Sequence, residues 1–134
     1  KLELDAETPT WVKSEHALPC GPVSRHVACR LDSLGKTTVI AHTFKGLMVY
    51  NKEEDKFETL KPAGEGPESV GLHAVAGLRG NTMVVYGGGT KDTSQGFSGD
   101  AFALRVDPDT GGWRWTKLQL PPDSPSPGQI GGAA

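Results

Sequence analysis

The sequence is poor in cysteine, in long apolar stretches and in charge of one sign. Its two cysteines, Cys20 and Cys29, either form a disulfide or remain free thiols. No apolar run approaches the roughly 18 residues of a membrane-spanning helix, so we expect a soluble protein without direct membrane insertion. Fourteen basic and sixteen acidic residues give a net charge of −2. Because no basic stripe stands out, the composition argues against nucleic acid and anionic lipid as partners.

Motifs of the common catalytic classes are also missing. The sequence has neither a Gly-x-Ser-x-Gly elbow nor an HExxH pair, and its four histidines are scattered. We therefore expect a non-catalytic protein with no cofactor and no metal. The chain begins with Lys1 rather than methionine, which fits processing or truncation, and nothing indicates its compartment.

Glycine and proline are abundant, with 18 and 10 residues, and they divide the chain into segments too short for amphipathic helices. Short β-type runs alternate with turn signals, which predicts an antiparallel all-β fold. In the turn Arg79-Gly80-Asn81, we expect Gly80 and Asn81 to take positive φ angles. The predicted strands are Val27–Leu31, Thr37–Ala41, Leu47–Tyr50, Lys56–Leu60, Leu72–Leu78, Thr82–Tyr86, Asp100–Val106 and Trp113–Leu118.

The sequence also contains an internal repeat. An aromatic residue is followed by a Gly-Pro or Pro-rich turn and then by a histidine or glycine 15 or 16 positions downstream. The aromatic positions are Trp11, Phe57 and Trp115, which are 46 and 58 residues apart, and the first two lead to His26 and His73. A repeat of this length with four strands per unit is typical of a propeller blade.

The second unit resembles the kelch repeat, the roughly 50-residue blade of one class of β-propeller. It has His73 before an apolar strand, the glycine run Gly87-Gly88-Gly89, and then Trp115. The first unit is degenerate, with Phe57 in place of the tryptophan. The resemblance implies an incomplete propeller of four-stranded antiparallel blades: residues 1–17 end one blade, 18–60 and 61–118 form two blades, and 119–134 begin another.

The recurring residues have structural roles in this interpretation. Trp11, Phe57 and Trp115 are expected to fill the space between adjacent blades. Gly87 and Gly88 would let a strand end pass close to its neighbours. His26 and His73 are expected to bond backbone groups of their own blades rather than a metal.

About two and a half blades are too few to close a propeller, which typically has four to eight. The remaining blades would come from the same or another chain. We therefore expect a protein-interaction or scaffold module, an accessory subunit of a larger assembly with protein partners. The resemblance leaves an alternative open: some kelch propellers are oxidases or isomerases, and such an active site would lie on blades absent from this sequence.

The expected binding surface is the end of the blades where the inter-blade connections and the loops between second and third strands meet. The second unit has its extra residues here, mostly in Thr90–Gly99. Insertions on one face of a repeat array are usual binding elements, although a tolerated surface loop explains this one equally well. The predicted partner contacts are Lys91, Asp92, Gln95 and Phe97.

Overall fold

The structure is a computed structural model that describes residues 2–3, 7–33, 35–68, 71–89, 96–119, 121–123, 125 and 128. In these residues it is all-β, as predicted, and consists mainly of two four-stranded antiparallel sheets. The first contains β3 (Val27–Ser33), β4 (Lys36–Thr43), β5 (Gly46–Asn51) and β6 (Lys56–Leu60) in that order. The second contains β7 (Ala74–Leu78), β8 (Thr82–Tyr86), β9 (Ala101–Val106) and β10 (Trp113–Leu118).

Each sheet is a simple meander, because each strand pairs with the next one along the chain. The eight strands match the eight predicted ones to within about two residues at each end. The turn between β7 and β8 differs in detail: the positive φ angles belong to Arg79 (51°) and Gly80 (73°), not to Asn81. Two consecutive positive φ values are the geometry that closes a tight hairpin without splaying its strands.

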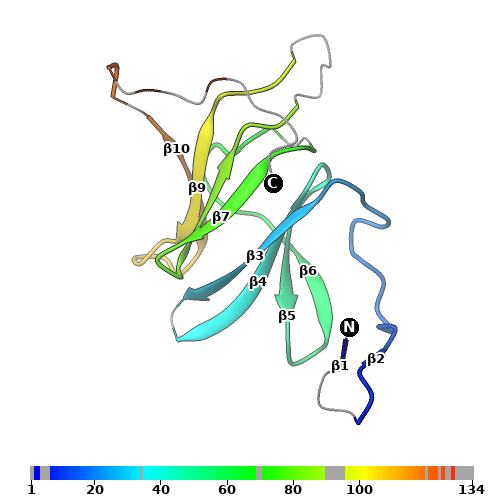
Figure 1. Ribbon diagram of the computed structural model, residues 1–134. Helices are drawn as coiled ribbons and strands as arrows, with labels where there is room; N and C mark the ends of the chain where they lie inside the picture. The colour runs from blue at the N-terminus through cyan, green and yellow to red at the C-terminus, as the bar shows by residue number, and fades with distance from the viewer. Residues whose placement is uncertain are drawn as a thin grey trace.

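The two sheets meet along their first strands. β3 lies against β7, and the amide of Asp32 at the end of β3 donates to the carbonyl of Gly80. From this contact the sheets diverge, so that β6 and β10 lie on opposite sides of the molecule (Figure 1). Side chains from both sheets form one apolar cluster of Leu31, Ile40, Leu47, Met83, Val85, Phe102, Leu104 and Trp115.

The connection between the sheets follows β10 before it enters β7. Ala63 pairs with Arg114 in a parallel bridge, and its carbonyl accepts the amide of Trp115 at 2.8 Å. Gly66 lies so close to the indole that a Cβ there would be 2.5 Å from Trp115 Cδ1. The connection therefore closes over Trp115, and only glycine fits at this approach.

The N-terminal segment departs from expectation. β1 (Leu2–Glu3) and β2 (Thr10–Trp11) pair only with each other, as a two-stranded ribbon. Trp11, which the repeat places between adjacent blades, is 78% exposed in this chain. Two-residue strands offer no sheet face for an indole to pack against. The segment 119–134 lies largely outside the described residues, and no described helix could span a membrane.

Candidate functional site

The predicted binding loop is only partly described. Lys91, Asp92 and Gln95 lie outside the described residues. Phe97 is described and is 40% exposed. Its ring lies over Gly89, with which it forms an isolated antiparallel bridge. The amide of Gly89 in turn donates to the carbonyl of Gly71 at 3.1 Å, which ties the loop to the segment before β7.

A second aromatic side chain occupies the corresponding loop of the first sheet. Phe44, in the turn between β4 and β5, is 42% exposed. The neighbouring Lys45 places its ammonium 5.5 Å from the ring centroid. The same ammonium donates to the carbonyls of Cys20 (2.9 Å) and Pro22 (3.1 Å), so the turn is fixed to the segment before β3. Sequence reasoning missed Phe44, although its place in a loop between second and third strands was the available signal.

The glycine run at the end of β8 makes a close backbone approach. Gly87 and Gly88 have φ angles of 70° and 97°, which disfavour other residues. A Cβ on Gly88 would be 2.9 Å from the Cβ of His73 and 3.2 Å from the carbonyl of Gly71. This end of the second sheet therefore has no room for a side chain at Gly88.

His73 and His42 form a buried pair between the two sheets. His42 Nδ1 lies 2.7 Å from His73 Nε2, and both residues are at most 3% exposed. Because two facing protonated nitrogens would repel each other, one ring donates and the other accepts. Trp115 packs edge-on to His42, with the ring centroids 6.1 Å apart. The pair thus joins β4 to the start of β7 through side chains.

This contact differs from the one that the sequence predicted for His73. The structure shows His73 bonded to a side chain of the other sheet, whereas a backbone group of its own blade was expected. His26, its counterpart before β3, is exposed. The partner of His73 is His42, at a position where the second repeat has Tyr86 in the same register. Repeat matching could not find the pair because its two members occupy different repeat positions.

Burial and the adjacent His73 ring lower the pKa of His42 from 6.5 to about 3. Between these values the unfolded chain binds more protons than the folded one, so the free energy of unfolding should fall as the pH falls. We expect a loss of about 2 kcal/mol between about pH 7.5 and pH 5. Urea unfolding at several pH values measures it.

The matched controls for this prediction are two glutamine variants. His42→Gln should flatten the pH dependence over this interval, whereas His26→Gln, at an exposed histidine, should keep the wild-type dependence. Equal pH dependence in wild type and His42→Gln would contradict the assignment.

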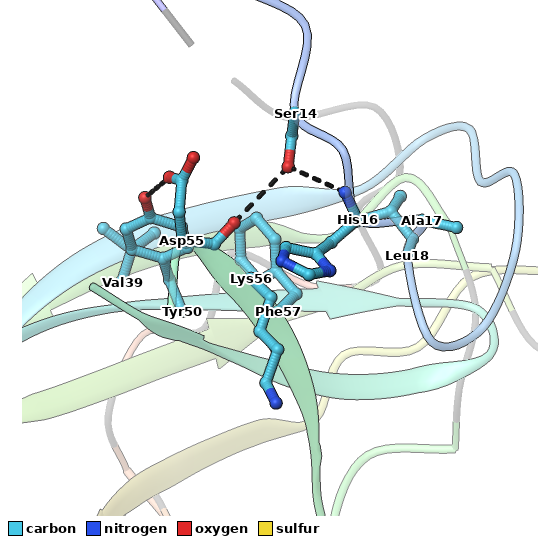
Figure 2. A pocket seen from close by; sticks show the side chains of 9 residues that line it. All are labelled: Ser14, His16, Ala17, Leu18, Val39, Tyr50, Asp55, Lys56 and Phe57. Atoms are coloured by element: carbon cyan, nitrogen blue, oxygen red, sulfur yellow. Dashed lines mark hydrogen bonds between the residues drawn. The ribbon is translucent and has the colours of Figure 1, made fainter. Parts of the chain in front are cut away.

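A pocket of about 530 Å³ lies on the outer face of the first sheet, away from the second (Figure 2). Val39, Tyr50 and Phe57 form its floor on β4, β5 and β6, and the segment Ser14–Leu18 covers one side. Phe57, expected between blades, is half-buried here and packs against Tyr50 with ring centroids 5.2 Å apart. The floor is thus largely apolar and aromatic.

Hydrogen bonds favour the protonated forms of two ionisable side chains in this pocket, Tyr50 and Lys56. The Asp55 carboxylate accepts the Tyr50 hydroxyl and raises the pKa of that phenol. The hydrogen bond to Glu54 likewise raises the pKa of Lys56. On the opposite face of the same sheet, where it packs against the core cluster, burial raises the pKa of the Cys29 thiol. Each shift favours the protonated group, whereas a nucleophile or base needs the deprotonated one.

Metal-binding groups and disulfides are equally sparse in the described part of the chain. It contains no cluster of three or more histidine, cysteine or acidic side chains that could hold a metal ion. Cys20 and Cys29 are both free, and Cys20 Sγ lies 3.4 Å from Met48 Sδ.

No protein-family model matches the sequence, and no curated protein matches it.

Proposed function

We propose that the chain is part of a kelch-type β-propeller and acts as a non-catalytic protein-interaction module. The two four-stranded meanders that meet at their first strands support the propeller assignment, because blades in that fold radiate from a common axis. The close approach at Gly88 supports the kelch assignment, since the repeat has a glycine pair at this strand end. The module would bind through the end of the sheets that carries the loops after β4 and β8.

The observation that carries the binding proposal is the exposure of one phenylalanine in each of these two loops. Phe44 is 42% and Phe97 is 40% exposed, and each loop is fixed by hydrogen bonds to the connection beside it. Partly exposed aromatic side chains on a rigid support are the usual anchors of protein interfaces. The basic Lys45 beside Phe44 favours a partner with an apolar groove bordered by acidic residues.

The test compares three forms of the chain as bait for proteins of the source cell. Phe44→Ser combined with Phe97→Ser should reduce retention of the true partner at least about tenfold, the effect of losing interface anchors. The control, Lys52→Ser with Asp109→Ser, changes exposed residues in the turns at the opposite end of the sheets. Quantitative mass spectrometry of the retained proteins measures the difference.

Two results would contradict the proposal. Equal retention of every protein by the phenylalanine variant and the control would exclude the loops as the binding surface. Stoichiometric copper or iron in the purified natural protein would favour the enzyme alternative, whose site would lie on other blades.

A further inference from the structure

The two sheets expose apolar faces on the sides that are turned away from each other. Successive strand residues point to opposite faces, and register partners share a face. The inner face of the first sheet includes the fully buried Leu31, and the inner face of the second includes Met83, Leu104 and Trp115. The other two faces carry apolar residues as well, and no four-stranded sheet in the described part of the chain packs against them.

The repeat relates these faces to one another. His26 and His73 each precede a first strand, and counting onward from them matches Leu31 with Leu78. The strand registers, with the β4–β5 register continued by one residue beyond Ile40↔Val49, then match Val39, Tyr50 and Phe57 of the first sheet with three residues of the second. These are Met83, Leu104 and Trp115, respectively.

These matches pair an exposed side chain with an open pocket. Inside the chain, Leu31 is buried in one cluster with Met83, Leu104 and Trp115. Its counterpart Leu78 is 53% exposed on the outer face of the second sheet. The counterparts of the other three residues form the floor of the 530 Å³ pocket on the outer face of the first sheet (Figure 2). Leu78 and the pocket therefore correspond to the two sides of the interface between the two sheets, which we call the internal interface.

We propose that a second copy of this chain docks head to tail, with Leu78 of one copy entering the pocket of Val39, Tyr50 and Phe57 in the next. The charges around the two surfaces agree with this occupant. Arg105 lies in the same cross-strand row as Leu78, through Thr82. Asp55 lines the pocket together with Lys56, and the Lys56 ammonium is already paired with Glu54 and Glu58. Opposite charges that approach each other favour this orientation of the copies.

One difference from the internal interface weakens the contact between copies. Gly77 lets β7 approach β3 closely, since a Cβ on it would be 3.4 Å from the carbonyl of Arg30. The position that matches Gly77 in the first sheet is Arg30 itself, which is exposed and paired with Asp32 at 3.3 Å. The long side chain prevents an equally close approach, so we expect reversible association.

The surfaces on the two copies differ, and this makes the contact heterologous. Such contacts generate rings or open chains, and an open chain keeps one free surface of each kind, at its two ends, until a ring closes. Two variants can therefore be made, each with one surface disabled. Leu78→Glu places a charge on the inserting side chain, and Val39→Glu places a charge of the same sign in the pocket, so that the two altered surfaces repel each other.

Sedimentation velocity of the 134-residue chain over a range of about 5–500 µM tests the proposal, because weak interfaces dissociate in this range. The sedimentation coefficient of the wild-type chain should rise with concentration. The species formed should be either assemblies larger than a dimer or a closed ring. Each variant alone should remain a monomer. An equimolar mixture of the two should form a 1:1 complex and nothing larger, because only one intact leucine surface and one intact pocket remain.

Circular dichroism and thermal unfolding establish that both variants keep the wild-type fold. If either has lost it, Leu78→Ser and Val39→Ser take their places in the same mixing experiment. A wild-type chain that stays monomeric throughout would overturn the proposal and assign the outer faces to other strands or another protein. Monomeric variants that fail to form the 1:1 complex would overturn it as well. The loop variants of Phe44 and Phe97 should leave the self-association unchanged, so the two proposals can fail separately.

Discussion

Replacing Trp115 by alanine should lower the free energy of unfolding by about 3–5 kcal/mol, the range measured for large aromatic residues in cores. The indole is 7% exposed and belongs to the cluster between the two sheets. It packs edge-on against both Phe102 and His42, with ring centroids 6.4 Å and 6.1 Å away. The connection at Gly66 closes over it. A cavity here would remove contacts with both sheets and with the segment that joins them.

Trp11→Ala is the matched control, because it makes the same chemical change at an indole that is 78% exposed. It should change the free energy of unfolding by no more than about 0.5 kcal/mol. Chemical denaturation followed by far-ultraviolet circular dichroism measures both variants without depending on tryptophan fluorescence. Similar effects at the two positions would contradict the placement of Trp115 in the only large apolar cluster of the described residues.

Gly88→Ala should cost about 2–5 kcal/mol, the sum of a strained backbone and an overpacked site. At a φ angle of 97° a side chain is disfavoured, and the new Cβ would be 2.9 Å from the Cβ of His73. Relief of this contact would push His73 from its hydrogen bond with His42. The variant should therefore be less stable. The pKa of His42 should also rise toward its ordinary value.

Gly111→Ala separates the two causes. Gly111 has a φ angle of 67°, but nothing lies within 4 Å of the position that its Cβ would take. It should cost about 1–2 kcal/mol, from backbone strain alone. Thermal unfolding of both variants gives the comparison, and an equal cost at the two glycines would show that Gly88 is required only for its φ angle.

Local patterns were sufficient to predict the strands. Alternation of apolar and polar residues over five or six positions is a local property, and the glycine- and proline-rich turns between strands are local as well. The turn at residues 79–81 was misassigned by one position, because Arg79 adopts a positive φ angle where a non-glycine residue rarely does. The tight hairpin places its positive φ angles at Arg79 and Gly80, and the carbonyl of Gly80 also accepts the amide of Asp32 from the other sheet.

The sites were harder to predict than the strands. Phe97 was expected at the loop end and is exposed there, whereas the equally exposed Phe44 was overlooked. The pocket floor of Val39, Tyr50 and Phe57 comes from three strands. One side of the pocket comes from Ser14–Leu18, more than 20 residues before Val39. No local pattern marks such a site, because it depends on which face of the sheet remains uncovered.

The sequence by itself determined the all-β class, the order of the strands and the repeat that matches one sheet to the other. These properties depend on the spacing of apolar, aromatic and turn residues along the chain, which can be seen in the sequence directly. Only the tertiary structure decided that His42 faces His73, that Trp11 is exposed while Trp115 is buried, and that Leu78 and the pocket face outward. Those outcomes depend on how two sheets pack against each other, and side chains distant in the sequence meet there for reasons of shape and burial.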